Sequence, residues 1–237
     1  NGSKAVITGV CKAALDEVVS DTAIPPRKTR VIYNAVNLDR FDPSIVRDPL
    51  WRAKWGIPQN AVVLGGAGRL VNIKRFDLFI DAAAEMIRKG SPAHFVIAGD
   101  GSLRGSLEQR IRKLGIGARF HLVGVQTDMQ RFLREIDVMV LSSDSEAFPL
   151  VLLEACAMNV PCIATAVGGV PEILEHGCGI LIERGSVETL VRAMESMMNA
   201  STRQQYANKG RETAERFSLS RIAAEYAALY DELLGRA

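Results

Sequence analysis

Short apolar segments alternate with amphipathic segments along most of the chain. The apolar runs are short and most are followed by glycine or a polar residue, which is typical of buried strands. The predicted strands cover residues 62–65, 94–98, 119–123, 137–141, 162–165 and 179–182. Because helical patterns fill the intervals between them, the sequence predicts an α/β fold, a doubly wound parallel sheet of the Rossmann-like kind. Ligand loops then lie at the carboxyl ends of the strands.

The beginning and the end of the chain differ from this pattern. A strand, a helix and a second strand are predicted at residues 4–9, 12–21 and 29–33. Such a unit is too small to bury a core of its own, so we expect residues 1–36 to be the tail of an N-terminal domain that the chain lacks. Residues 37–216 are predicted to form the main domain. Residues 217–237 carry apolar positions at helical spacing and are expected to pack back toward the missing domain.

Composition and charge narrow the class of protein. At 237 residues, with 48% hydrophobic and 24% charged residues, the chain has the composition of an ordinary globular protein. Its net charge is +2, and no run of like charges occurs along the sequence. A basic surface for a nucleic acid is therefore not expected, and contact with a membrane is at most peripheral. No apolar run approaches the roughly 20 residues that span a bilayer. We expect a cytoplasmic protein, free or at the inner face of the membrane, with Cys11, Cys156, Cys162 and Cys178 as reduced, mostly buried thiols.

Two glutamates flank the start of a predicted helix. Residues 137–141 form a buried strand, the next residues a turn that holds Glu146, and Pro149 the first position of a helix. The unpaired amides and positive dipole end of that helix favour an anion. Glu146 can then accept hydrogen bonds from sugar hydroxyls, and Glu154, about two turns further on, can bind a ribose diol.

A divalent-metal site is the alternative interpretation of this segment. Asp144-Ser145-Glu146 has the form of an Asp-x-Asp motif, but no second cluster of carboxylates or histidines nearby would complete an oxygen-rich shell. We therefore expect no metal and no cofactor.

The segment from Gly65 to Lys74 is predicted to be a phosphate loop between a strand and a helix. Its glycines allow close backbone approach, and Arg69 and Lys74 can both reach one diphosphate, the first as a planar fork and the second as a point charge. It is not a dinucleotide fingerprint, because Val71 stands where a glycine is needed, and it lacks the Gly-Lys-Ser/Thr of a Walker loop. Two cations on a solvated rim are the competing interpretation.

Three further glycine turns follow predicted strands. Gly99 with Gly101, and Gly124 after Val123, can pass a nucleobase and offer backbone hydrogen bonds to its edge, although a plain tight turn explains each one alone. Gly168-Gly169 would bring the chain near a bound phosphate. In addition, Glu172 is expected to support the cationic residues opposite, and His94, His121 and His176 are expected to be satisfied structural histidines.

Taken together, these residues resemble the C-terminal, donor-binding domain of retaining glycosyltransferases of the GT-B fold, the family of glycogen synthases, sucrose synthases and many lipopolysaccharide transferases. The resemblance rests on Val31–Asn37 with Phe41 and Pro43, on Gly68-Arg69-Leu70 with Lys74, on Ala98-Gly99-Asp100-Gly101, on Val123-Gly124, on the pair Glu146 and Glu154, and on Gly168–Glu172. Pro149 stands where many members have glycine, and Asn37 where aspartate is frequent.

The resemblance implies a role for each matching residue. Arg69 and Lys74 would bind the donor diphosphate, Glu146 the transferred sugar and Glu154 the ribose. The other donor-binding positions that it implies are Gly68, Gly99, Gly101, Val123, Gly124, Ala147, Phe148, Leu150, Val151 and Gly169. It also implies retention of the anomeric configuration without a metal, by front-side attack in which a donor phosphate oxygen helps to remove the acceptor proton.

We therefore expect the donor-binding half of a glycosyltransferase that uses a nucleoside-diphosphate sugar to build a polysaccharide or glycolipid. A sugar or lipid-linked acceptor would bind through the missing N-terminal domain, so the fragment alone is expected to bind a nucleotide sugar weakly and to transfer nothing. The alternatives are a non-catalytic nucleotide-sugar-binding module that works with a partner chain, and a GT-B-like nucleotide-sugar epimerase.

Overall fold

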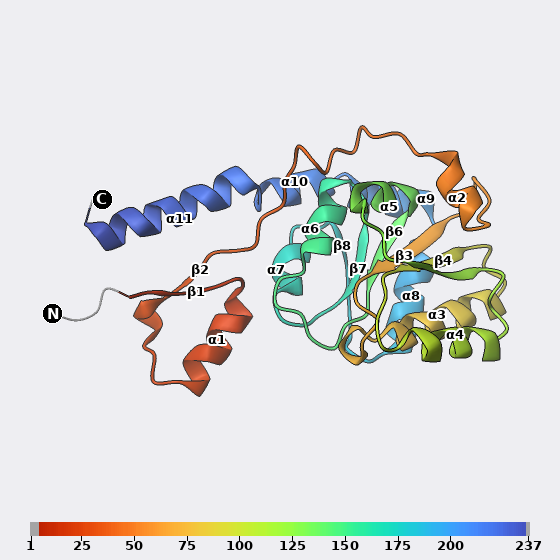
Figure 1. Cartoon of the computed structure of the whole chain (residues 1–237), viewed down its shortest axis with the longest axis horizontal. Coiled ribbons are helices and arrows are strands. Elements are labelled where there is room, and N and C mark those ends of the chain that lie inside the picture. The colour runs from red at the N-terminus through yellow and green to blue at the C-terminus, as the bar shows by residue number, and fades with distance from the viewer. Residues whose placement is uncertain (1–4, 236–237) are drawn as a thin grey trace.

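The computed structural model describes residues 5–235, and a six-stranded parallel sheet forms its centre (Figure 1). The strands lie in the order β5-β4-β3-β6-β7-β8, which confirms the doubly wound sheet predicted from the sequence. Their bounds are β3 (Val63–Ala67), β4 (His94–Ala98), β5 (Phe120–Gly124), β6 (Val138–Leu141), β7 (Cys162–Thr165) and β8 (Gly179–Ile182). The order changes direction between β3 and β6, so the crevice for a ligand lies above the carboxyl ends of these two strands.

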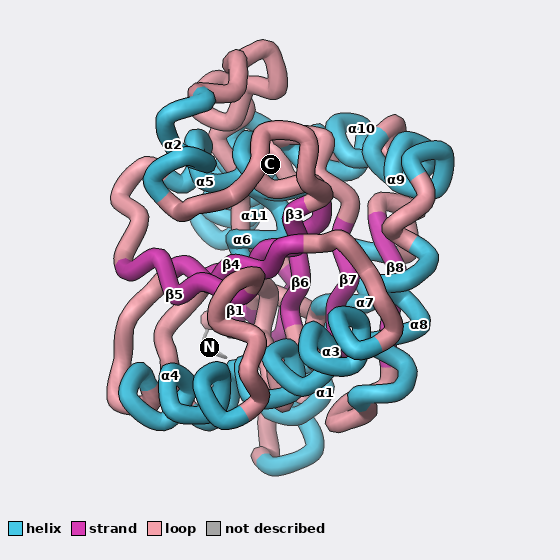
Figure 2. The backbone as a smooth tube through the Cα atoms, turned by 90° about the vertical axis from the view of Figure 1, so that its right-hand side faces the viewer, coloured by secondary structure: helices cyan, strands magenta, loops and turns pink. Residues whose placement is uncertain are grey.

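Helices cover both faces of the sheet (Figure 2). One face carries α3 (Phe76–Arg88), α4 (Arg104–Lys113) and α8 (Val187–Ser196), and the other carries α2 (Pro49–Lys54), α5 (Met129–Glu135), α6 (Leu150–Ala157) and α10 (Gly210–Glu215). The short helix α7 (Val170–Leu174) follows β7, and α9 (Ala200–Ala207) joins α8 to α10. The apolar strand residues therefore point into two separate cores, one on each face.

A small N-terminal unit stands beside this domain. It consists of β1 (Ile7–Gly9), α1 (Lys12–Asp21), the 3-10 turn η1 (Pro26–Lys28) and β2 (Thr29–Val31), with the two strands paired in parallel. The long helix α11 (Leu219–Leu234) extends from the domain to this unit (Figure 1). Ile32 packs against Ile222 and Leu229 of α11, and Arg30 forms a 2.8 Å ion pair with Glu232. The division into domains at residues 36 and 216 stays a prediction.

The chain crosses between the unit and the domain at two adjacent places. Val36 forms a parallel bridge with Ser218, the amide of Val36 donates to the carbonyl of Phe217 at 2.8 Å, and the amide of Leu219 donates to Val36 at 3.2 Å. Beside this bridge the rings of Tyr33 and Phe148 lie 4.9 Å apart, and each also contacts Phe217. The connection between the unit and the domain thus consists of two hydrogen-bonded segments, at Val36 and Ser218, with an aromatic cluster packed beside them.

Arg52 anchors α2 to the sheet from a fully buried position. Its guanidinium donates to the carbonyl of Glu135 at 2.7 Å, to those of Ala61 and Gln59 at 2.8 and 3.0 Å, and to the Asp137 carboxylate at 3.1 Å. Nothing in the sequence pattern marked this arginine as buried, because its partners come from separate segments.

Several local expectations need correction. Gly66, expected in the loop, lies with Gly65 inside β3, and a side chain at either position would collide with Phe76 or Ile136. Pro149 caps α6, whose first helical residue is Leu150. The first predicted strand begins at Ile7, and its residue 4 lies outside the described residues. The four cysteines are free and buried, as expected of them.

The histidine prediction was wrong for two of the three residues. The rings of His94 and His121 stack with centroids 5.8 Å apart, while Nδ1 of His94 and Nε2 of His121 are buried and find no hydrogen-bond partner within residues 5–235. Burial lowers the pKa of both rings from the ordinary 6.5. No helix in the described range has the length and apolar character required to span a bilayer.

Candidate donor-binding site

Glu146 lies in the β6–α6 loop with its carboxylate held from two sides. Oε1 receives the ammonium of Lys74 at 2.5 Å and the hydroxyl of Ser143 at 2.6 Å. The Lys74 and Glu146 side chains are only 19% and 10% exposed, so the pair is shielded from competing water. Because both donors use the same oxygen, Oε2 remains available to accept from a ligand hydroxyl.

Lys74 is held in turn by the short turn that carries it. It ends the 3-10 turn η2 (Asn72–Lys74), and Arg75 follows in the left-handed region with φ 47° and ψ 41°. The Ser142 hydroxyl donates to the carbonyls of Lys74 and Arg75, at 3.1 and 2.9 Å. The Arg75 guanidinium is fixed by Asp77 at 3.1 Å and Asp144 at 3.2 Å. The loops after β3 and β6 are therefore tied together, which offsets the strain at Arg75.

Gly168 and Gly169 place the β7–α7 loop against the Glu146 loop. A Cβ on Gly168, whose φ is 51°, would lie 1.6 Å from the carbonyl oxygen of Glu146, and one on Gly169 would lie 2.5 Å from that of Ala147. The Gly169 amide donates to Ala147 at 2.7 Å. The two glycines thus allow a close approach between two protein loops, and their expected approach to a phosphate stays a prediction.

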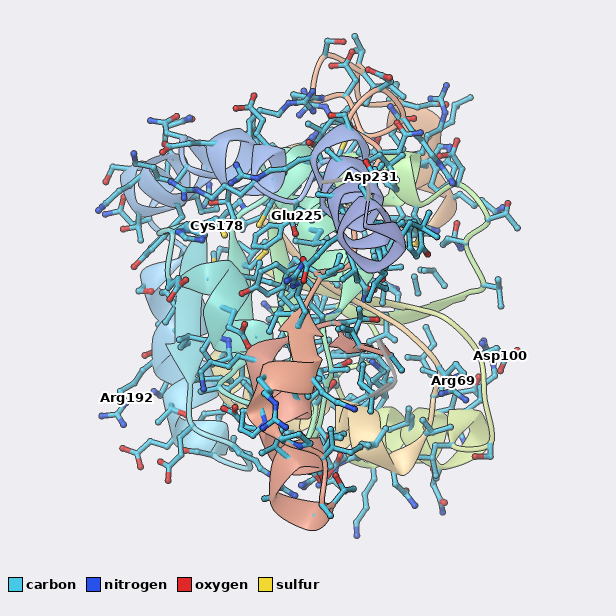
Figure 3. The ribbon with its side chains drawn as sticks, turned by 90° about the vertical axis from the view of Figure 1, so that its left-hand side faces the viewer. Arg69, Asp100, Cys178, Arg192, Glu225 and Asp231 are labelled. Atoms are coloured by element: carbon cyan, nitrogen blue, oxygen red, sulfur yellow. The ribbon has the colours of Figure 1, made fainter. Side chains whose placement is uncertain are left out.

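A cavity of about 260 Å³ opens at the carboxyl ends of β3, β4 and β5. Arg69 and Asp100 contribute to its wall from neighbouring loops, and Figure 3 shows the two side chains close together. Arg69 is exposed, and its guanidinium has no partner among residues 5–235. The full lining is Ala67, Gly68, Arg69, Ala98, Gly99, Asp100, Val125, Gln126 and Met129.

Part of that lining escaped the sequence analysis. Gln126 and Met129 follow β5, and their position after a strand end was the only available signal, whereas Val125 belongs to the glycine turn that was predicted to pass a nucleobase. The Gln126 amide donates to the carbonyl of Val123 at 2.8 Å, which fixes its side chain at the cavity wall.

Gly99 and Gly101 hold the β3 and β4 loops in contact. A Cβ on Gly99, with φ 142°, would lie 1.9 Å from the carbonyl oxygen of Gly68, and one on Gly101 would lie 2.6 Å from that of Leu70. Gly124 has open space and a φ of 72°, and its carbonyl accepts from the Gly99 amide at 2.8 Å. Of the glycines predicted to meet a nucleobase, Gly99 lines the cavity, whereas Gly101 and Gly124 contribute to loop geometry.

A second cavity of about 430 Å³ lies on the other side of Glu146. One wall is the start of α1, including Cys11 and Ala14, and the others come from the loops after β6, β7 and β8. Arg184 reaches into this group with a 3.3 Å contact to Asp144. Neither the cavity nor Arg184 was predicted from the sequence, since no local pattern places α1 opposite Glu146.

Glu154 sits on α6 with a partly buried carboxylate. Burial raises its pKa, and the positive charge of Arg40 opposes that rise only in part. In the part of the chain that the structure describes, its carboxylate has no hydrogen-bond donor. A desolvated carboxylate without a partner is unfavourable, so a diol at this position would satisfy it.

The remaining predicted donor-binding residues lie at the start of α6 and differ in whether the side chain or the backbone is accessible. The Phe148 side chain is buried in the aromatic cluster with Tyr33, and the Phe148 carbonyl accepts from Asn34 at 2.9 Å. Of the polar groups of Phe148, only the backbone amide is then left for a ligand. Leu150 is 48% exposed and Val151 half-buried in the first turn of α6, where helix amides have no intrahelical acceptors.

Glu172 does not face the cationic residues. Its carboxylate accepts from the amides of Lys12 and Ala13 and from the Tyr33 hydroxyl. The expected role is therefore replaced by a contact with the N-terminal unit. Across residues 5–235, no three His, Cys, Asp or Glu side chains gather as metal ligands would.

The fold and these loops are those of the C-terminal half of a GT-B protein. A family model for glycosyl transferases group 1 matches residues 48–213, and the chain belongs to that family. This confirms both the resemblance and the fold class predicted from the sequence.

Individual relatives agree with this assignment. N-acetyl-alpha-D-glucosaminyl L-malate synthase of Bacillus anthracis is 28% identical over 97% of this chain and 60% of its own length. UDP-Gal:alpha-D-GlcNAc-diphosphoundecaprenol alpha-1,3-galactosyltransferase of Escherichia coli is 31% identical over 74% of this chain and 46% of its own length. The chain thus spans at most about 60% of these relatives.

Solved structures share the fold. The crystal structure of Anabaena Alr3699/HepE in complex with UDP-glucose superposes with a TM-score of 0.85 and 23% identity, over 96% of this chain and 64% of that one.

Proposed function

We propose that the chain is the donor-binding part of a retaining, metal-independent glycosyltransferase that uses a nucleoside-diphosphate sugar. The juxtaposition of an unpartnered arginine with a fixed carboxylate carries this proposal. Arg69 lies in the loop after β3 and borders the cavity above β3 and β4. Glu146, held by Lys74, lies in the loop after β6, on the other side of the crevice between β3 and β6. A diphosphate between them would meet the Arg69 guanidinium and the amides that open α6.

Each end of the donor then has a partner of matching chemistry. The base would enter the cavity beside Gln126, the ribose diol would satisfy the unpaired Glu154, and the sugar would donate to Oε2 of Glu146. Negative charge builds on the leaving diphosphate as the glycosidic bond breaks, so fixed cations and helix amides stabilise the transition state. Lys74 both orients Glu146 and adds positive charge without a metal ion.

The biosynthetic role is proposed from the relatives. The Escherichia coli relative is named for transfer to a diphosphoundecaprenol-linked sugar, and a biosynthetic transfer to a polysaccharide or glycolipid acceptor suits this chain as well. The acceptor would face the second cavity beside Glu146, which α1 borders.

Calorimetry with UDP-, GDP- and ADP-linked sugars, with and without EDTA, tests the proposal. A donor at 100 times its Kd should raise the free energy of unfolding by about 2.7 kcal/mol, and EDTA should leave its affinity unchanged. Absence of binding by all three classes at millimolar concentration would refute the donor site. Mixing with a separately expressed N-terminal domain of a group 1 glycosyltransferase, followed by analysis of the anomeric configuration of the product, tests transfer and retention.

A further inference from the structure

Glu172 caps a helix that lies about 160 residues away in the sequence. It stands in the first turn of α7, and its two carboxylate oxygens accept from the Lys12 amide at 3.0 and 3.1 Å. The Ala13 amide adds a 3.5 Å contact and the Tyr33 hydroxyl a 3.0 Å hydrogen bond. Lys12 and Ala13 open α1, so the carboxylate satisfies amides that the helix itself leaves unpaired and opposes the positive end of its dipole.

The same place brings the N-terminal unit against the Glu146 loop. A Cβ on Gly169 would lie 2.6 Å from the Cβ of Cys11, 2.5 Å from the carbonyl oxygen of Ala147 and 2.7 Å from the Phe148 ring. Three segments therefore meet around one glycine with no room for a side chain. A shift of α1 relative to α7 changes the packing around Gly169, which caps α7 and donates to Ala147 in the loop that carries Glu146.

We propose that Glu172 is a positioning residue, which fixes α1 on α7 and thereby sets where the Glu146 carboxylate stands. The effect passes from Glu172 to the Lys12 and Ala13 amides, and then through the Gly169 contact to Ala147. The sugar end of the donor site consequently depends on a contact made by the N-terminal unit. The nucleotide end, above β3 and β4, does not. This inference rests on the proposed function only for its ligand readout.

Hydrogen exchange tests the mechanical part without any ligand. The reporters are the amides of residues 12–14 and the Gly169 amide, which donates to Ala147 at 2.7 Å. In Glu172→Ala both reporters should exchange on the order of tenfold faster, while β3 and β4 keep their protection. Glu172→Gln, which keeps the shape and one acceptor, should restore part of the protection. Faster exchange at residues 12–14 alone, with Gly169 unchanged, would reduce Glu172 to a helix cap and overturn the proposal.

Glu175→Gln is the matched control. Glu175 follows at the end of the same helix, its side chain is 64% exposed, and its charged contact is a 3.7 Å approach to His176. This variant should leave both sets of amides as in the parent chain. Tyr33→Phe removes one of the Glu172 contacts without touching the α1 amides, and should give a smaller increase at Gly169.

A ligand measurement separates the inference from the proposed function. UDP and UDP-glucose are the probes, and the ratio of their affinities isolates the contribution of the sugar. Glu172→Ala should lower that ratio about fivefold with little change in the affinity for UDP. Equal losses for both probes would indicate general destabilisation and overturn the inference. If the parent chain binds neither probe, the failure counts against the use of a UDP-linked donor, and the exchange result alone decides the role of Glu172.

Discussion

The ammonium of Lys74 and the carboxylate of Glu146 are joined at 2.5 Å across the crevice between the loops after β3 and β6. The pair is largely shielded, and the Ser143 hydroxyl completes the coordination of the same carboxylate oxygen. Lys74 therefore holds a carboxylate in place, in contrast with Arg69, which has no partner in residues 5–235. The sequence predicts both cations as diphosphate ligands, and in the structure Lys74 also pairs with Glu146 whereas Arg69 does not.

This difference predicts separate outcomes for two substitutions. Arg69→Ala should weaken binding of UDP and of UDP-glucose by the same factor, about tenfold or more, because a charge-assisted hydrogen bond contributes about 1.5–3 kcal/mol. Its melting temperature should not change. Lys74→Ala leaves Glu146 buried without its cation and should lower the free energy of unfolding by about 1–3 kcal/mol.

Calorimetry and urea titration check both variants, with Arg192→Ala as the control. Arg192 is an exposed helix residue on α8, and Figure 3 shows it pointing away from the domain, far from Arg69. Equal stability losses in Arg69→Ala and Lys74→Ala would contradict the separation of roles.

Glu154→Gln should affect stability and binding in opposite directions. Burial raises the pKa of Glu154, so the ionised form is unfavourable in the folded protein at neutral pH. Removing the charge should raise the free energy of unfolding of the unliganded chain, by up to about 1 kcal/mol. It should also weaken nucleotide binding, since a neutral amide is a poorer partner for a ribose diol. Thermal melts and calorimetry at pH 7 measure the two effects, and a destabilised variant would show that Glu154 is already satisfied.

Gly168→Ala should disrupt the site more than an ordinary glycine substitution. The new Cβ would lie 1.6 Å from the Glu146 carbonyl oxygen, and the φ of 51° disfavours any side chain. We expect a loss of more than about 2 kcal/mol in the free energy of unfolding, or a displaced Glu146 loop with weak sugar binding. Gly105→Ala is the control, because it lies in helix α4 with open space around it and should stabilise the chain by about 0.5–1 kcal/mol.

Stability should fall as the pH drops below the ordinary histidine range. The folded chain lowers the pKa of His94 and His121, first through burial, so the unfolded chain binds more protons between those lowered values and 6.5. The stabilisation is complete above 6.5 and is lost on acidification below it. Urea titrations at pH 8, 7, 6 and 5.5 should show this decline, and His121→Leu should flatten it. An unchanged slope in that variant would assign the decline to other groups.

Elements with strong periodicity were predictable because their signal is local. The strands at residues 94–98, 162–165 and 179–182 and the helix at residues 12–21 have the predicted bounds. Contacts between distant segments were not, and the clearest case is Glu172, whose partners lie near the start of the chain. The contact of Gly168 with the Glu146 loop was unpredictable for the same reason, since a glycine pair looks alike in sequence whether it faces a phosphate or another backbone.

The parallel bridge between Val36 and Ser218 limits how the two parts of the molecule can move. A single connecting segment allows rotation about many axes. Two neighbouring segments joined by hydrogen bonds, here at Val36 and Ser218, favour bending about one axis that passes through both. Helix α11, which leaves this axis and lies along the N-terminal unit, travels with that unit in any such bending. Helix α11 is therefore mechanically part of the N-terminal unit, although it lies at the other end of the sequence.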